Sequence, residues 1–143
     1  TKRRRYVYTV IDLYTRMAYA EVHAHIRPGV AAEVVMRSST KFGFVFSLVQ
    51  ADNGPEYSRY FGERLIRHGI AVRHSRLGRP NDNAHIERFN RTVQEECLGS
   101  TLTYKTTNIV VQARLTAYLD YYNFERVHLG LQCLTPVEML RRC

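Results

Sequence analysis

Two carboxylates, Asp52 and Glu87, are the side chains of this sequence best suited to chemistry. Asp52 follows a short apolar run at residues 45–51, and Glu87 lies on the first turns of a segment with helical spacing, after a polar loop. Mg²⁺ prefers oxygen ligands and usually takes one or two carboxylates together with oxygens of a phosphate substrate. Two such ions about 3.5 to 4 Å apart assist an in-line displacement at phosphorus. The pair predicts metal-dependent phosphoryl transfer, provided that folding brings both side chains to a shared cation.

A simpler interpretation of the same two acids stays open. Asp52 begins an Asp-Asn-Gly sequence, which is a routine turn, and Glu87 could be a solvated acid on a helix surface. On spacing alone, this turn-and-surface interpretation is favoured over the catalytic one.

The charge of the chain predicts an anionic partner. Among 143 residues, 21 Lys and Arg outweigh 13 Asp and Glu, which gives a net charge of +8, and 18 of the 21 cations are arginine. The planar guanidinium fork suits phosphate oxygens, so nucleic acid is the expected partner. Charge alone is equally compatible with a protein that is merely basic.

Composition narrows the class of protein further. No run of 18 uncharged apolar residues occurs, and the first residues lack the pattern of a signal peptide. Three widely spaced cysteines, Cys97, Cys133 and Cys143, form neither a disulfide framework nor a Cys-x-x-Cys metal pair. We therefore expect one cytoplasmic domain over residues 1–143, without a membrane partner.

The first third of the chain predicts two strands and a helix. Aromatic and β-branched residues at 6–11 and 17–23 are typical of strands that pair as an antiparallel hairpin. A helix is expected at 28–43, because Pro28 suits a first turn, Gly43 a last one, and a buried stripe recurs at Ala31, Val34, Val35, Ser38 and Phe42.

The next segment predicts a strand, helix, strand unit. The nearly continuous apolar run at 45–51 indicates a strand buried on both faces. A helix from Glu56 to a stop at Gly69 is expected to carry Tyr57, Phe61, Leu65 and His68 on one side. A strand at 70–74 follows, and the two strands should be parallel.

Two further helices are expected after a turn-forming loop at 75–83. From Ile86 to Cys97 apolar residues recur with helical spacing, beside a polar row of Glu87, Asn90, Arg91 and Gln94. A last helix at 107–124 is expected to bury a stripe of Val110, Ala113, Ala117, Tyr121 and Phe124. The element order predicts an α/β domain with a mixed sheet, and the lack of a glycine-rich strand-to-helix turn disfavours a doubly wound nucleotide fold.

Four sequence blocks resemble one family. They are YVYTVIDLYTR at 6–16, DNGPEY at 52–57, NDNAHIERFN at 81–90 and YNFERVH at 122–128. In this order they are similar to the integrase catalytic core shared by bacterial insertion-sequence transposases and retroviral integrases. The resemblance implies a ribonuclease H-like mixed sheet flanked by helices, with an Asp, Asp, Glu triad that binds Mg²⁺ or Mn²⁺, two ions with DNA bound, for DNA cleavage and strand transfer. Asp52 matches the second acid and Glu87, 35 positions later, the third.

The resemblance also implies where DNA would bind. Polar residues along the helix that carries the glutamate face DNA in the family, and by position these are Asn90, Arg91 and Gln94. The loop at 78–83, with Arg79, is expected to help position DNA. A solvated helix face is the competing interpretation of the row. Because transposition brings two DNA ends together, the resemblance further implies a homo-oligomer.

One departure from the family pattern concerns the first acid. In the family this acid lies on a strand upstream of the block at 6–16, and Asp12 matches a position that is usually not a metal ligand. We therefore expect the sheet to lack its first strand, leaving a gap at its centre, a compensating strand or an unstable fragment. The alternative is that residues 6–11 serve as that strand, with Asp12 as the first acid.

Three functions follow for testing. The first is a transposase or integrase core that cuts and joins DNA. The second is a nuclease of the ribonuclease H type that acts on structured RNA or on RNA–DNA hybrids. The third is a catalytically incomplete fragment that only binds DNA or an intact transposase. His85 and His128 could approach a phosphate, but as isolated histidines they are better interpreted as surface or hydrogen-bonded residues.

Overall fold

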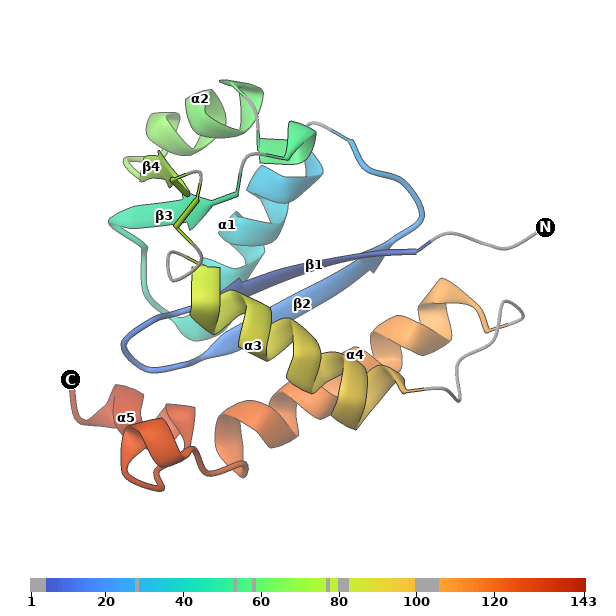
Figure 1. Cartoon of the computed structure of the whole chain (residues 1–143), viewed down its shortest axis with the longest axis vertical. Coiled ribbons are helices and arrows are strands. Elements are labelled where there is room, and N and C mark those ends of the chain that lie inside the picture. The colour runs from blue at the N-terminus through green and yellow to red at the C-terminus, as the bar shows by residue number, and fades with distance from the viewer. Residues whose placement is uncertain are drawn as a thin grey trace. The chain divides into compact units, whose positions relative to one another are not determined.

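The chain divides into two compact units, one formed by residues 1–24 and 85–143 and the other by residues 25–84. The computed structural model describes residues 5–27, 29–52, 54–57, 59–76, 78–79, 83–99 and 106–143 (Figure 1). None of the helices in this described part has the length and apolar run that crossing a bilayer requires.

The first unit begins with the predicted hairpin. Strand β1, Tyr6–Ile11, pairs antiparallel with β2, Ala18–His23, so that Tyr6 lies opposite His23 and Ile11 opposite Ala18. Both strands are rich in β-branched and aromatic residues, which pack well on a pleated surface. The prediction of an antiparallel hairpin is confirmed.

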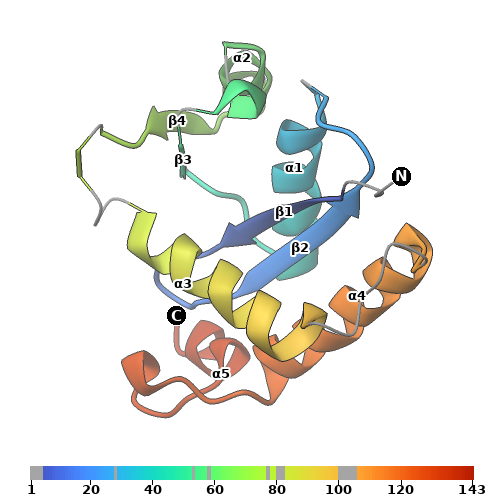
Figure 2. The same ribbon diagram turned by 45° about the vertical axis from the view of Figure 1, so that its right-hand side comes forward.

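Helices cover one side of this hairpin. Helix α3, Ala84–Val93, continues into a π-helical segment, η3, Gln94–Leu98. Helix α4, Asn108–Phe124, follows, and after a short turn η4, Leu129–Leu131, the chain ends with α5, Pro136–Arg141. Figures 1 and 2 show α3 and α4 beside each other along the hairpin.

The core of the first unit lies between the hairpin and these helices. Ala18, Ala20 and Val22 on β2 supply one wall, with exposed fractions between 0% and 9%. The helices supply the opposite wall, which consists of Phe89, Val93, Leu98, Val111, Leu115, Leu119 and Tyr122. Small residues on the strand against large residues on the helices let the two layers approach closely. The expected apolar face of α3 at Phe89 and Val93 is confirmed.

The predicted buried stripe of α4 was wrong. All five of its residues are exposed, namely Val110, Ala113, Ala117, Tyr121 and Phe124. The buried side is one or two residues further along, at Val111, Leu115, Leu119 and Tyr122. Because α4 carries apolar side chains around much of its circumference, periodicity alone did not select the face. Burial of the larger Leu side chains removes more apolar area from water than burial of the two alanines.

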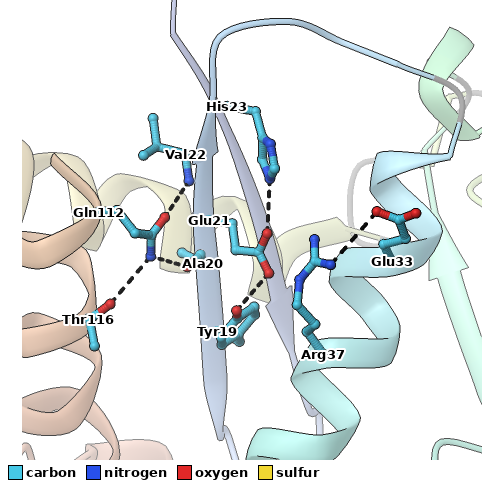
Figure 3. A network of polar contacts seen from close by, with 9 residues as sticks. All are labelled: Tyr19, Ala20, Glu21, Val22, His23, Glu33, Arg37, Gln112 and Thr116. Carbon is cyan, nitrogen blue, oxygen red and sulfur yellow. Dashed lines mark hydrogen bonds and ion pairs between the residues drawn. The ribbon is translucent and has the colours of Figure 1, made fainter. Parts of the chain in front are cut away.

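Two side-chain amides of α4 fix its rotation against the sheet. Gln112 accepts a hydrogen bond from the Val22 N–H at 2.8 Å and donates to the Ala20 carbonyl at 3.4 Å (Figure 3). Asn123 accepts from the Ala18 N–H and donates to the Ala18 carbonyl, both at 2.9 Å. Four backbone groups of β2 thereby find side-chain partners on α4, and buried backbone groups of this kind need such partners.

The second unit contains a helix and a parallel strand pair. Helix α1, Val30–Phe42, ends at Gly43 in a left-handed conformation with φ 83°, and it buries the predicted stripe of Ala31, Val34, Val35, Ser38 and Phe42. Strands β3, Leu48–Ala51, and β4, Ala71–His74, pair in parallel with Leu48 opposite Ala71. The short η1, Pro55–Tyr57, and helix α2, Arg59–Arg67, connect them. The parallel arrangement is confirmed.

The expectation for the strand at 45–51 was wrong in length and in burial. β3 has four residues, Leu48 is 47% exposed and Val45 is 75% exposed. Phe44 and Phe46 instead join Phe42 in a cluster with ring centroids 5.6 to 6.0 Å apart. Aromatic packing at the end of α1 therefore uses Phe46, which the apolar run assigned to a strand. On α2, Phe61 and Leu65 are buried as predicted, whereas His68 is exposed.

The described strands form two separate ladders. One is antiparallel, β1 with β2, and one is parallel, β3 with β4. Both pairing modes of the expected mixed sheet are thus present. Within the described residues no fifth strand pairs with either ladder.

Candidate functional site

Glu87 lies in the first turn of α3 with its side chain exposed. Phe89 and Val93 on the opposite side of the helix are 2% exposed and hold α3 against the hairpin. An acid in the first turn is favoured by the partial positive charge of a helix N-terminus. Among the described residues, none bonds to or pairs with the Glu87 carboxylate.

The predicted polar row of α3 is exposed along its whole length. Asn90, Arg91 and Gln94 share this exposure with Glu87. No acidic side chain in the described ranges lies within ion-pair distance of Arg91, so its guanidinium is available to an external anion. The structure therefore brings these four residues together on one solvent-facing surface.

One member of the row is tied to the sheet. The Thr9 hydroxyl of β1 donates a hydrogen bond of 2.6 Å to Oδ1 of Asn90. Sequence reasoning missed Thr9, because nothing in a strand sequence marks which hydroxyl meets a helix 81 residues away.

Asp52 follows β3 directly and is exposed. Its Oδ1 accepts a hydrogen bond from the Gly54 N–H at 2.7 Å, which is the geometry of an Asx turn. Its main-chain carbonyl lies 3.2 Å from Nδ1 of His74, the residue on β4 after which the ladder ends. The turn interpretation is thus realised for one carboxylate oxygen, while Oδ2 is not used by that turn.

Gly54 lies close to the side chains of two acids in this turn. A Cβ at this position would lie 3.0 Å from Oδ1 of Asp52 and 2.9 Å from Oε2 of Glu56. Such contacts are closer than real Cβ atoms tolerate without movement of the neighbours. A side chain at this position would therefore displace the Asp52 and Glu56 carboxylates from the places they occupy here.

Asp12, the alternative first acid, is engaged in the hairpin turn. Its Oδ2 accepts hydrogen bonds from the backbone N–H of Thr15 at 2.9 Å and from the Thr15 hydroxyl at 2.7 Å. The turn also holds Arg16 at φ 64°, with its N–H bonded to the Asp12 carbonyl at 2.8 Å. Asp12 therefore stabilises the turn that follows β1.

The two predicted metal ligands belong to different units, Asp52 to residues 25–84 and Glu87 to the other unit. Within the described part of the chain, no three acidic, histidine or cysteine side chains are grouped closely enough to hold a metal ion. Each of the two carboxylates nevertheless offers an exposed oxygen, the donor type that Mg²⁺ and Mn²⁺ accept.

The C-terminal block at 122–128 serves the interior of the protein. Arg126 donates two hydrogen bonds to Glu96, from Nε to Oε1 at 3.0 Å and from the terminal nitrogen to Oε2 at 2.8 Å. Its guanidinium carbon lies 5.7 Å from the centre of the Tyr122 ring. The Tyr118 hydroxyl donates to the same Glu96 at 2.7 Å. This cluster links η3, which continues the helix of Glu87, to the end of α4.

The electrostatics of the cluster follow from these contacts. The hydrogen bond from Arg126 lowers the pKa of Glu96 and, in return, raises the pKa of Arg126. Burial, followed by the hydrogen bond to Glu96, raises the pKa of Tyr118. Burial raises the pKa of Tyr122 to about 12. Glu96 is therefore a charged acceptor and both phenols stay neutral at physiological pH.

The two histidines raised by the sequence differ in their surroundings. Burial lowers the pKa of His128, whose ring packs edge-on against Tyr122 with centroids 4.7 Å apart. Burial, with the charges of Arg16 and Arg88, lowers the pKa of His85. His128 thus belongs to the packed interior, whereas His85 is exposed at the start of α3. In the loop at 75–83, Arg79 is exposed and several of its neighbours lie outside the described residues.

Comparison with known proteins places the chain in a family. Models of the integrase core domain match residues 1–80 and residues 68–136. An insertion element IS407 protein of Burkholderia multivorans is 31% identical over 95% of this chain and 49% of its own length. The putative transposase InsK of insertion element IS150 from Escherichia coli is 36% identical over 64% of this chain and 32% of its own length. The chain spans about half, or less, of the curated relatives it matches.

Solved structures show the same fold. The catalytic core of BIV integrase matches with a TM-score of 0.72 and 18% identity, over 95% of this chain and 85% of that one. A chain of the simian T-cell lymphotropic virus intasome matches with a TM-score of 0.76 and 17% identity, over 93% of this chain and 47% of that one. Together with the match of an integrase core model to more than half of the residues, these findings show that the chain belongs to the integrase core domain family and has its ribonuclease H-like fold.

Proposed function

We propose that this chain is the catalytic core of a DNA transposase or integrase, which cuts a DNA strand and joins the new end to a target phosphodiester. The observation that carries the proposal is the state of Glu87. It is an exposed acid on a helix held firmly by buried Phe89 and Val93, and no described side chain engages its carboxylate. A rigidly mounted carboxylate without a protein partner suits a ligand for an external cation.

Asp52 and Glu87 would together hold Mg²⁺ or Mn²⁺. When bound, the cation polarises a phosphoryl oxygen and neutralises developing negative charge. Glu87 and Asp52 would each offer carboxylate oxygen to the cation, and in Asp52 the turn to Gly54 uses Oδ1 only. The hydrogen bond from the Gly54 N–H orients the Asp52 carboxylate, as partners of metal ligands commonly do.

The rest of the α3 row would bind the DNA backbone. Arg91 lies one turn beyond Glu87 and can donate two parallel hydrogen bonds to a phosphate. Asn90 and Gln94 would add neutral donors on either side. Phosphate contacts of this kind set the register of DNA without reading its sequence. A homo-oligomer is part of the same proposal, because transposition brings two DNA ends together.

The test is metal-dependent cleavage and strand transfer on duplex DNA by a version of the protein extended upstream to supply the first acid of the triad, and by two variants of it, Asp52→Asn and Glu87→Gln. Both should lose activity by about 1000-fold, since several kcal/mol of transition-state stabilisation are removed. Glu95→Gln changes another exposed acid on the same helical run and should retain activity. Activity that persists in both site variants would remove the two acids from the mechanism.

A substrate panel separates the alternatives. Cutting confined to the RNA strand of an RNA–DNA hybrid would indicate a ribonuclease H-type nuclease. Salt-sensitive DNA binding with no cleavage in Mg²⁺ or Mn²⁺ would indicate a fragment that only binds DNA. Titration of the protein with Mn²⁺ in a calorimeter gives an independent readout, because both site variants should bind the ion more weakly.

A further inference from the structure

Thr9 is a polar residue on an otherwise apolar strand face. Its neighbours on the same side of β1, Val7 and Ile11, pack against the core of the first unit, as alternation along a strand requires. Thr9 sits between them and directs its hydroxyl to Oδ1 of Asn90 at 2.6 Å. A strand that needed only to pack would be served as well by valine, which has the same shape without the hydroxyl.

The hydrogen bond decides which end of the Asn90 amide faces solvent. An asparagine side chain has one acceptor end and one donor end, and the two can exchange by rotation. Because the Thr9 hydroxyl donates to Oδ1, the NH₂ group must point away from the strand. Within the described residues no partner takes these N–H donors, and Asn90 is exposed.

The position of this donor pair is informative. Asn90 follows Glu87 by three residues on α3, and residues with this spacing are neighbours on a helix surface. A phosphate oxygen bound by the Asn90 NH₂ group would therefore lie next to the Glu87 carboxylate.

We propose that Thr9 is a positioning residue, which locks the Asn90 amide so that its NH₂ group donates to a phosphodiester oxygen of DNA beside Glu87. The inference rests on the proposed function, because it names how one residue of the α3 row is prepared for DNA. Fixing the amide in advance removes the cost of ordering it when DNA binds.

A purely structural role makes a different prediction. The hydrogen bond is exposed, so water can replace the hydroxyl at Asn90 when Thr9 is changed. Thr9→Val also adds an apolar methyl between Val7 and Ile11. Stability should therefore stay the same or rise in Thr9→Val, while DNA affinity should fall. If Thr9 were needed only for packing, Thr9→Val would lower both stability and DNA affinity, or would change neither.

The experiment measures DNA binding by the full chain, using fluorescence anisotropy of a labelled duplex at fixed salt. Thr9→Val and Asn90→Ala should each weaken binding about five-fold, the equivalent of one hydrogen bond. The double variant should bind no more weakly than either single variant, because the two residues act through one contact. Thr9→Ser keeps the hydroxyl and should bind like the unchanged protein.

A second readout follows the amide itself. In ¹⁵N–¹H spectra, the Asn90 side-chain NH₂ signals should shift on addition of DNA in the unchanged protein and in Thr9→Ser. In Thr9→Val the response should be reduced. Thermal unfolding of all variants shows whether affinity changes without loss of stability.

Two results would overturn the inference. If Asn90→Ala weakens binding but Thr9→Val binds normally, Thr9 does not position the amide, and the DNA-binding role of Asn90 survives. If Asn90→Ala also binds normally, that role fails together with the inference, while loss of cleavage in Glu87→Gln would still support the proposed function. Parallel loss of stability and affinity in Thr9→Val would assign Thr9 to packing.

Discussion

Two polar regions of the first unit look alike in sequence and differ in structure. The α3 row consists of Glu87, Asn90, Arg91 and Gln94, and all four side chains are exposed. The C-terminal motif consists of Tyr122, Asn123, Arg126 and His128, and its polar groups mostly have partners within the protein. Both regions contribute to the resemblance to integrase cores, but they contribute in different ways.

The difference is one of available bonding capacity. Apart from Oδ1 of Asn90, the side-chain donors and acceptors of the α3 row are not used by any described residue. In the C-terminal motif, by contrast, Asn123 bonds to β2 and Arg126 bonds to η3. Arg126 binds Glu96 in the continuation of the very helix that carries Glu87. Motif residues of this second kind would support the proposed site without contacting its ligand, and sequence similarity does not separate the two kinds.

The largest expected difference in stability between the two regions concerns two asparagines, one in each region. Asn123 is 2% exposed and its amide satisfies both backbone groups of Ala18. Asn123→Ala should lower the free energy of unfolding by about 3 kcal/mol, because two buried backbone groups lose their partners. Asn90→Ala should change it by less than about 0.5 kcal/mol, as an exposed substitution does. Urea unfolding at pH 7 measures both, and equal losses would contradict the division into two regions.

A smaller effect is expected at the Glu96–Arg126 pair, and it depends on pH. Arg126→Met should lower the free energy of unfolding by about 1 kcal/mol at pH 7. The effect is modest because the ion pair is partly exposed and solvent screens it. The pKa of Glu96 is lowered in the folded state, so the folded protein binds this proton less readily than the unfolded chain. Its stabilisation is therefore present above about pH 4.5, the ordinary value for Glu, and is lost as the pH falls through the lowered pKa.

The measurement is unfolding free energy between pH 7 and pH 3 for the unchanged protein, Arg126→Met and Glu96→Gln. The difference in unfolding free energy between the unchanged protein and either variant should become smaller as the pH falls. A gap that is constant over this range would mean that packing of Arg126 on Tyr122, rather than the ion pair, supplies the stability.

The smallest effect on stability should come from the α3 row. Arg91→Gln should leave the unfolding midpoint unchanged, because Arg91 is exposed and unpaired in the described structure. DNA binding should weaken uniformly across sequences, and the slope of log K against log salt should fall by about 1, as for one lost phosphate contact. An unchanged salt slope would place Arg91 outside the DNA interface.

Local sequence rules predicted several elements well, and the reason is physical. The hairpin of β1 and β2 and the end of α1 at Gly43 depend on β-branched residues, turn residues and a left-handed glycine, all read within a few positions. The strand at 45–51 was misjudged because aromatic contacts with Phe42 draw Phe46 out of a strand. Such contacts are invisible to a window that sees only hydrophobicity.

The candidate site shows the same limit. Asp12 and Asp52 each follow a strand and begin a turn, and their sequence contexts do not tell them apart in kind. In the structure, Oδ2 of Asp12 accepts hydrogen bonds from both the backbone N–H and the hydroxyl of Thr15. Asp52 accepts one hydrogen bond, from the Gly54 N–H. Thr9, which meets Asn90 across 81 residues, had no local signal at all.

The sequence by itself determined which family the four blocks resemble, where most helices and strands lie, and which side of α3 is polar, because these depend on residue type and on local spacing. Only the folded chain shows which face of α4 is buried, which acid uses its oxygens as hydrogen-bond acceptors in a turn, and which polar groups have no partner among the described residues. These outcomes depend on partners that arrive from distant parts of the chain, and a hydrogen bond or a buried contact exists only once both partners are in place.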